Sequence, residues 1–312
     1  MTAAPRPLRP GDVAAGRRPL RHRDVVAAAR PLRPADVAAA ARVAHQTFAH
    51  QDRELGHPAS PYSQAARARA ERRLAHLLAT DPGGAWVTAR DGAITGVSAS
   101  LVRDGIWGLS LLAVLPVHQG AGAGRALFDA ALTHGGGGRG GIIVASPDAR
   151  ALRSYRRAGF APHPALAARG TIDRARLPAT PNVRPGTLAD LPLTAAVDRE
   201  IRGADHLPDW ELIITNGDRL LVIEDRGYVI LTGAGVYALA ARDQRAAREL
   251  LAAALVEVEP GDAAVVTDMT SAQQWAIEVC IDAGLAVTPD GSVCVRGELG
   301  PLQPYLPSGA FL

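Results

Sequence analysis

The stretch "LPVHQGAGAGRALF", residues 115–128, joins an apolar run to a helical pattern. The run "LSLLAVLPV" (109–117) leads into it, and "RALFDAALTHG" (125–135) continues it. Three glycines stand at alternate positions of the loop: Gly120, Gly122 and Gly124. Successive small residues let backbone N–H groups turn inward, and the start of a helix adds the positive end of its dipole. The stretch therefore predicts either a loop that holds a pyrophosphate or a simple tight turn.

The common nucleotide-binding motifs do not fit this loop. The chain has no Gly-Lys-Ser or Gly-Lys-Thr, so the loop is not a P-loop. The third glycine of a G-x-G-x-x-G fingerprint is also absent, because Ala126 and Leu127 follow Arg125. The loop therefore excludes these two nucleotide-binding classes.

The composition predicts a soluble globular protein. The 312 residues are 47% hydrophobic, and no apolar run approaches the ~18 residues that span a bilayer. The N-terminus lacks the apolar segment of a secretory signal. The cysteines, Cys280 and Cys294, offer neither a disulfide framework nor a zinc pattern. We therefore expect a cytoplasmic protein with no bound metal and no membrane partner.

The charges are distributed unevenly along the chain. All 34 cationic residues are arginine, in a chain rich in Ala, Gly and Pro, which is the coding bias of a GC-rich genome. Arginine content is therefore weak evidence for nucleic-acid binding. Residues 1–182 hold 25 arginines against 12 acidic residues, and residues 183–312 hold 9 against 19. The two halves should therefore attract each other, and the positive half suits a polyanionic ligand. The alternative is that the charges of each half only keep its surface soluble.

A short repeat marks the N-terminus. The segments "RPLRPGDVAA", "RPLRHRDVVA" and "RPLRPADVAA" begin at Arg6, Arg18 and Arg30. Only the third continues into a long amphipathic pattern. Residues 1–28 are therefore expected to be a disordered leader rich in Arg and Pro.

A second repeat has the size of a domain. Three pairs of segments match: 30–36 with 184–190, 85–97 with 220–232, and 146–160 with 271–285. The first pair, "RPLRPAD" and "RPGTLAD", places an Asp to cap the following helix. The predicted organisation is two copies of one α/β module at 29–172 and 183–298, a linker at 173–182 and an apolar tail at 299–312.

The loop and a second motif resemble the GNAT N-acetyltransferase superfamily. The family's loop pattern, V-x-P-x-x-Q/R-x-x-G-x-G/A, is matched by Val114, Pro116, Gln119, Gly122 and Gly124. Its second signature, N-x-x-A-x-x-x-Y before a Gly-Phe, is matched by Asp148, Ala151, Tyr155, Gly159 and Phe160, with Asp148 in place of Asn. The resemblance covers residues 29–172 well and residues 183–298 in outline.

The resemblance implies a fold and a co-substrate. Each module would be a mixed, mainly antiparallel central sheet flanked by helices. The co-substrate would be acetyl-CoA, its pantetheine lying between splayed central strands like an added strand. The residues implied to contact it are Val114, Gln119, Gly120, Ala121, Gly122, Ala123, Gly124, Arg125, Asp148 and Ala151.

The reaction implied is direct attack of an amine on the thioester, with Tyr155 as the general acid. A nearby set of arginines is expected to lower its pKa: Arg153, Arg156 and Arg157. The strand expected at 108–116 carries no acidic residue for a general base, and Ser110 is its only hydroxyl. In the related enhanced-intracellular-survival acetyltransferases a terminal carboxylate is the base. That resemblance implies that the carboxylate of Leu312 is the base here. The alternative is that the tail simply docks on the second module.

The second module lacks the equivalent residues. Cys280 stands where Tyr155 stands in the first, and we expect a buried apolar cysteine rather than a nucleophile. The counterpart of the glycine loop, "LAARDQRAARELL" (239–251), has no glycine. We interpret the module as structural or as one wall of the substrate site. Its acidic stretch, 198–211, either attracts a cationic amine or is a solvated helix face.

Together these features predict an acetyl-CoA-dependent N-acetyltransferase that acts on a primary amine of a small molecule. The missing base keeps one alternative open, a non-catalytic acyl-CoA sensor or partner-binding protein. A further alternative is nucleic-acid binding through residues 1–34, which hold eight arginines against two acidic residues, and the composition disfavours it. A homodimer stays open.

Overall fold

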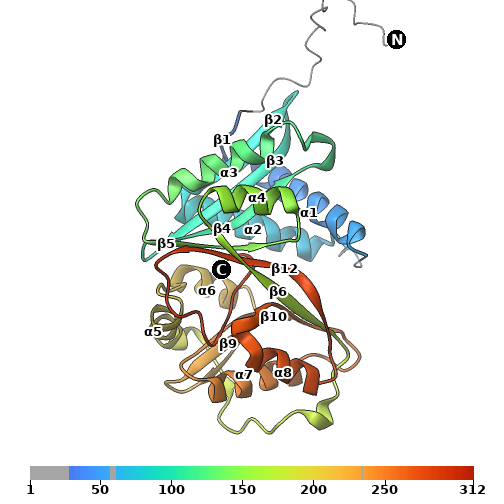
Figure 1. Cartoon of the computed structure of the whole chain (residues 1–312), viewed down its shortest axis with the longest axis vertical. Helices are drawn as coiled ribbons and strands as arrows, with labels where there is room; N and C mark the ends of the chain where they lie inside the picture. Colours follow the sequence, from blue (N-terminus) through green and yellow to red (C-terminus); the bar gives the residue numbers. More distant parts are fainter. Residues whose placement is uncertain (1–27, 57–60, 234) are drawn as a thin grey trace, which may run out of the picture.

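The computed structural model describes residues 28–56, 61–233 and 235–312, so nearly all of the predicted leader (1–28) lies outside it. Within these ranges the same order of elements occurs twice (Figure 1). The first set is β1 (Arg30–Pro31), α1 (Val37–Glu54), α2 (Gln64–Thr80), β2 (Ala85–Arg90), β3 (Ala93–Arg103), β4 (Ile106–Val114), α3 (Ala123–His134), β5 (Gly140–Ala145), α4 (Ala149–Arg157) and β6 (Ala161–Gly170). The second set is β7 (Arg184–Pro185), α5 (Leu191–Ile201), α6 (Leu207–Thr215), β8 (Arg219–Ile223), β9 (Gly227–Thr232), β10 (Gly235–Ala241), α7 (Gln244–Val256), β11 (Ala264–Thr270), α8 (Gln274–Asp282) and β12 (Ala286–Gly297), followed by β13 (Tyr305–Leu306).

A short 3-10 turn precedes the first helix of each set. In both turns an arginine and an aspartate six residues apart form an ion pair, Arg30–Asp36 at 2.6 Å and Arg184–Asp190 at 2.7 Å. Each carboxylate also accepts a hydrogen bond from the N–H three residues earlier. Neither Asp side chain caps its α-helix, so that expectation from the sequence is wrong. The two carboxylates close the turn before the helix instead.

The strands form one sheet in which the two modules exchange their last strands. Its order is β1-β2-β3-β4-β5-β12-β6-β11-β10-β9-β8-β7. β12 lies between β5 and β6, antiparallel to both, and β6 lies between β12 and β11. The mixed, mainly antiparallel sheet expected from the sequence is confirmed. The module boundaries at 29–172 and 183–298 stay a prediction, but neither segment contains all of its own sheet.

Helices cover both faces of this sheet (Figure 1). In the first module α3 and α4 share a buried cluster that includes Trp107, Phe128, Tyr155 and Phe160. In the second module α7 and α8 pack over the sheet in a separate core. On the other face α1, α2, α5 and α6 contribute to one large core, which joins the two modules. Within the described ranges no helix has the length and apolar character needed to cross a membrane.

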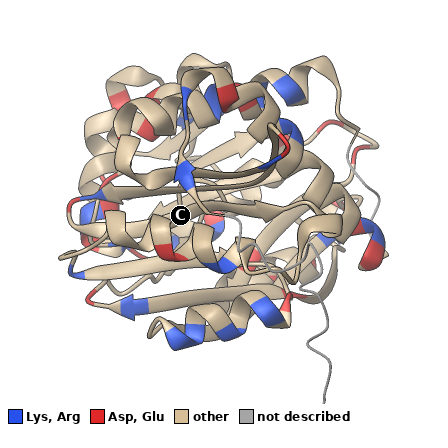
Figure 2. Ribbon diagram, turned by 90° about the horizontal axis from the view of Figure 1, so that it is seen from above, with Lys and Arg blue, Asp and Glu red and all other residues tan. Residues whose placement is uncertain are grey.

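Ion pairs also join the halves. Arg69 pairs with Asp218 and Arg103 with Asp209, each at 2.8 Å. In both pairs the arginine comes from the first half and the acid from the second, as the opposite net charges predict, whereas Arg199 and Asp104, 3.1 Å apart, pair the other way round. Elsewhere cationic and acidic residues are interspersed over the ribbon (Figure 2).

The tail, residues 299–312, folds back into the molecule. β13 pairs antiparallel with the end of β10, with Leu306 opposite Leu239 and Tyr305 opposite Ala240. β9 occupies one side of β10, and β11 pairs in parallel with the other side only at Gly235. β13 therefore fills the space where β10 and β11 diverge.

Candidate active site

The glycine loop has a left-handed backbone at two of its three glycines. Gly120 and Gly122 have φ angles of 81° and 85°, a left-handed conformation that side chains with a Cβ rarely adopt. α3 begins directly after Gly122, and no side chain caps its first turn. The Gln119 side chain donates a hydrogen bond to Val114 O at 2.9 Å, which closes the loop on the end of β4. The first N–H groups of α3 are thus left for a ligand.

A cavity of about 760 Å³ lies beside this loop. Most of the predicted cofactor-binding residues line it together with Tyr155: Val114, Gln119, Gly120, Gly122, Gly124, Arg125, Asp148 and Ala151. Ala121 and Ala123 are not among the lining residues, and Ala123 is buried in the core beneath the loop. A contact from these two residues is therefore limited to their backbone N–H groups.

The cavity lies where the central strands separate. β4 and β5 pair in parallel only from Ile106–Gly140 to Gly108–Ile142 and then diverge. The opposite wall is the second half of α1, where the sequence has no diagnostic pattern. This wall is marked by large apolar side chains that are exposed: Phe48 is 40% exposed and Leu55 is 44% exposed. A space between two diverging strands suits an extended chain that bonds like a strand.

Asp148 is held by its own helix rather than being free for a ligand. It is the N-cap of α4, and its carboxylate accepts hydrogen bonds from Arg150 N at 2.7 Å and from the Arg150 side chain at 2.8 Å. Burial acts to raise the pKa of Asp148, but these bonds outweigh it and lower the pKa. Asp148 is therefore a charged carboxylate, unlike the neutral Asn that the motif usually has.

Tyr155 reaches the cavity from α4. Its ring packs against Phe128 at 5.1 Å between centroids, in the cluster under α3 and α4. Burial raises the pKa of Tyr155 well above its ordinary value, and Cys294 and Asp148 add to this. The expectation that the neighbouring arginines lower this pKa is wrong, because burial dominates. The hydroxyl therefore stays protonated through the neutral range.

The predicted absence of an acidic base on β4 leaves two other groups near the separation of the strands. Ser110 is the extra residue of a β-bulge, since Leu109 and Leu111 pair with consecutive residues of β3. Its Oγ is buried and has no hydrogen-bond partner within the described residues. Leu312 is fully buried in a cluster with Ile142 and Val293, next to Gly108. The tail therefore contacts the first module as well as the second, so it does not simply dock on the second module.

The counterpart site in the second module differs in each of its features. Cys280 is buried, burial raises its pKa to about 12, and its nearest polar neighbour is the sulfur of Met269 at 4.0 Å. The expectation of a buried, unreactive cysteine is confirmed. Asp243 caps α7 by accepting a hydrogen bond from Ala246 N at 3.0 Å, so the helix start is already occupied. β13 fills the space between the strands.

The acidic stretch 198–211 is mostly buried structure. Asp198 and Asp209 are fully buried, and Asp205 is 7% exposed. Asp209 accepts hydrogen bonds from His76 and Arg103, and these lower its pKa against the effect of burial. Neither interpretation, an attracting surface or a solvated helix face, holds for these three residues. The sequence alone does not show that such acids have buried partners.

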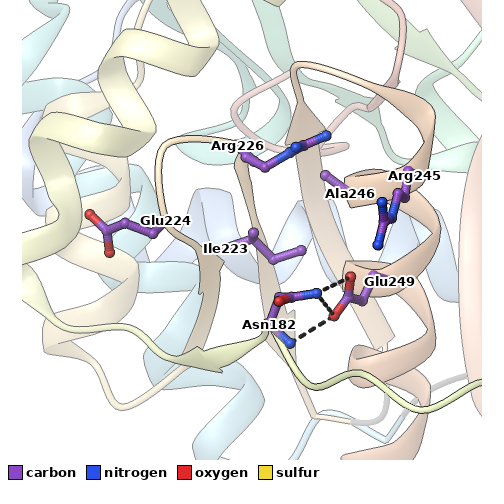
Figure 3. A pocket seen from close by; sticks show the side chains of 7 residues that line it. All are labelled: Asn182, Ile223, Glu224, Arg226, Arg245, Ala246 and Glu249. Carbon is purple, nitrogen blue, oxygen red and sulfur yellow. Dashed lines mark hydrogen bonds between the residues drawn. The ribbon is translucent and has the colours of Figure 1, made fainter.

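A second cavity, of about 330 Å³, lies on the second module beside the start of α7 (Figure 3). Asn182 and Glu249 close one end of it through hydrogen bonds of 2.8 to 3.1 Å. Arg226 is taken by an ion pair with Asp243. This cavity has no splayed strands and no tyrosine, so it does not repeat the first site.

The fold and the first cavity define the class of protein. A glycine loop at a helix start, a tyrosine on the next helix and a separated pair of parallel strands meet at one cavity. Residues 47–160 match the model of the Acetyltransferase (GNAT) family. Residues 47–160 therefore carry a domain of the GNAT acetyltransferase family, a class that transfers acetyl groups from acetyl-CoA.

Solved structures agree on the fold over both modules. The chain is similar to a provisionally named acetyltransferase from Pyrococcus horikoshii, with 14% identity, a TM-score of 0.73 and coverage of 91% of this chain and 95% of that one. It is also similar to a GCN5-related N-acetyltransferase from Sphaerobacter thermophilus (19% identity, TM-score 0.55, 86% and 95% coverage). A tandem GNAT protein from the clavulanic acid biosynthesis pathway is similar too (16% identity, TM-score 0.54, 86% and 98% coverage). No curated protein matches the chain.

Proposed function

We propose that this protein uses acetyl-CoA to acetylate a primary amine of a small molecule, with Tyr155 as the general acid. One observation carries the proposal: the glycine loop, Asp148 and Tyr155 line a single cavity at the point where β4 and β5 have separated. The uncapped start of α3 suits the pyrophosphate, and the space between the strands suits an extended pantetheine. Arg125, whose side chain is 79% exposed at the loop, is placed to meet a further phosphate.

Acetyl transfer to an amine requires two proton movements. The amine nitrogen attacks the thioester carbon, the C–N bond forms, the C–S bond breaks and one proton leaves the nitrogen. A Lys-like amine with a pKa of ~10.4 is neutral in only about one molecule per thousand near pH 7.4, so a group must accept that proton. The departing thiolate takes a proton from the Tyr155 hydroxyl, and solvent restores it. The raised pKa of Tyr155 keeps this donor protonated, but it also makes the hydroxyl a weaker acid than a thiol of pKa ~8.5, so the transfer to the thiolate is uphill.

The general base stays a prediction, namely the carboxylate of Leu312. Leu312 is buried against Gly108 and Ile142, the last parallel pair before the strands separate, and it does not itself line the cavity. Addition of one residue after Leu312 would turn that carboxylate into an amide. Loss of turnover with unchanged acetyl-CoA binding would support the base, and unchanged turnover would remove it.

We infer that acetyl-CoA binds the first module alone. The second has an internally capped helix start at Asp243 and a tail strand, β13, in the space that pantetheine would need. The fixed strand also brings residues 307–312 toward the first module. On this inference the second module binds no acetyl-CoA and supports the first module structurally.

Two measurements test the function. Calorimetric titration with acetyl-CoA should give one site per chain, and two sites would contradict the inference about the second module. Thiol release from acetyl-CoA should then be followed with spermidine, tyramine and glucosamine as amines. Turnover that falls in Tyr155→Phe without loss of acetyl-CoA binding supports the enzyme. Binding of acetyl-CoA without turnover of any amine would favour a sensor instead.

A further inference from the structure

A fully buried polar cluster of the second module ends at Leu312, which packs against Gly108 and Ile142 of the first module's strands. His206, just before α6, has its Nδ1 2.8 Å from Asp198 Oδ2 and its Nε2 2.8 Å from Leu312 O. A main-chain oxygen only accepts hydrogen bonds, so Nε2 is the donor. His206, Asp198 and Leu312 are all 0% exposed.

The histidine is fixed from behind. Asp198 Oδ1 accepts a hydrogen bond from the Tyr228 hydroxyl at 2.6 Å, and Oδ2 accepts one from Trp210 Nε1 at 3.2 Å. The His206 ring stacks on Trp210 with 4.4 Å between centroids. Three elements, α5, α6 and β9, thus orient one imidazole. Buried polar groups of this kind are often replaceable by apolar residues without loss of stability, so stability alone does not account for them.

The oxygen that this cluster holds lies at the separation of the strands. Leu312 packs with Ile142 and Val293, whereas the adjacent Ile143 and Cys294 belong to the cluster of Tyr155. Successive residues of a strand point to opposite faces of the sheet. Leu312 and Tyr155 therefore lie on opposite faces of the same strands.

We propose that Asp198 and His206 are positioning residues for acetyl transfer: they hold the main-chain oxygen of Leu312 at the separation of β4 and β5. The inference rests on the proposed function and gives the second module a specific role in it. The acetyl-CoA cavity has no lining residue from this cluster. Loss of the cluster therefore affects the rate of transfer and not the affinity for acetyl-CoA.

The test compares His206→Leu, which has no donor, with His206→Gln, whose amide N–H replaces the donor. A matched control is His134→Gln, because His134 pairs with Asp81 at 3.2 Å in the first module, away from the tail. Hydrogen exchange of residues 308–312, where Leu312 N donates to Ser308 O at 2.7 Å, reports whether the tail is held. Steady-state kinetics with the fastest of the three amines reports kcat and KM.

We expect His206→Leu to raise exchange of residues 308–312 and to lower kcat, each by about tenfold or more, with an unchanged KM for acetyl-CoA. His206→Gln should recover much of both, and the control should change neither. Unchanged exchange in His206→Leu would overturn the proposal, as would a released tail with full kcat or a Gln variant no better than Leu. If the wild type turns over no amine, the proposed function fails, and the exchange measurement still decides whether His206 holds the tail.

Discussion

The side chain of Leu312 occupies the space that a side chain on Gly108 would need. A Cβ added at Gly108 would lie 2.4 Å from Leu312 Cδ1. Gly108 belongs to β4 of the first module, and Leu312 reaches it from the tail of the second. The end of the sequence and the centre of the first module's sheet are therefore fitted to each other.

Gly108→Ala should displace Leu312 without altering the cavity proposed to bind acetyl-CoA, which Gly108 does not line. We expect turnover to fall about tenfold or more at an unchanged Kd for acetyl-CoA, because a shift of about 1 Å in a catalytic group has effects of this size or larger. The control is Gly235→Ala in β10, where the nearest atom to an added Cβ is 3.5 Å away. Full activity in Gly108→Ala would show that the position of Leu312 is irrelevant to the reaction.

The raised pKa of Tyr155 predicts the alkaline side of the pH profile. A general acid fails as pH rises through its pKa, and burial moves that of Tyr155 well above its ordinary ~10. The rate should therefore rise with pH as the amine loses its proton and should show no descending limb from Tyr155 below pH ~10. Rates of wild type and Tyr155→Phe from pH 6 to 10 provide the measurement. A descending limb near pH 9 that the Phe variant lacks would argue against a buried, protonated tyrosine.

The left-handed conformation of Gly122 predicts a specific loss of binding. Alanine at a φ of 85° costs about 1–2 kcal/mol of strain, and relief of that strain would tilt the loop N–H groups away from the ligand. We expect Gly122→Ala to weaken acetyl-CoA binding about tenfold by calorimetry. Gly92→Ala carries the same kind of strain, at a φ of 78° in a hairpin turn with nothing within 4 Å. An equal loss of affinity in both variants would mean that the loop has no special role in binding.

The sequence predicts those features of the site that lie in one local stretch. The glycines and Tyr155 are each fixed by spacing within a loop or a helix, and the structure brings them to one cavity. No pattern in the sequence singles out Phe48 and Leu55, because an exposed apolar side chain on a helix looks like any other until the opposite wall is known. Asp198 belongs to a stretch that looks like a charged surface, because its partner Tyr228 lies outside that stretch and no local pattern shows that His206 turns back to it.

The exchange of strands was equally hidden from the sequence. The pattern of apolar and polar residues along β6 and β12 is the same whichever module each strand completes. The pattern therefore does not predict which of the two pairings forms. The register does choose, with β12 pairing β5 from Ser292–Ala145 to Gly297–Gly140. The linker then connects modules that are already paired through their last strands.

The exchanged strands predict that the two halves fold only together. Expressed alone, residues 1–182 would leave β5 and β6 without β12, and residues 183–312 would leave β11 and β12 without β6. We expect each half alone to lack a cooperative melting transition, and a tagged first half to co-purify with an untagged second half when the two are co-expressed. A monomeric first half that melts cooperatively by itself would mean that the exchange is not needed for folding.

Asp268 predicts how stability depends on pH. This residue of β11 is buried, accepts a hydrogen bond from Thr267 Oγ1 at 2.6 Å and has a φ of 62°. Burial raises its pKa to about 6, Thr267 and Arg169 counteract this, and Asp290 adds to it. A carboxyl group whose pKa is higher in the folded than in the unfolded protein stabilises the fold only while it is protonated. The contribution of Asp268 to the free energy of unfolding is therefore full below pH ~4 and is lost as pH rises through about 6.

Asp268→Asn should remove this loss. Asn accepts the same Thr267 hydrogen bond, tolerates the left-handed backbone and has no charge to bury. Wild type and variant should be similar near pH 4, and the variant should be more stable by about 3 kcal/mol at pH 8, as measured by urea unfolding. Asp91→Asn is the control, because Asp91 has a φ of 51° but a side chain that is 95% exposed, and it should show no such divergence. Parallel stability curves for wild type and Asp268→Asn from pH 4 to 8 would show that folding does not raise the pKa of Asp268.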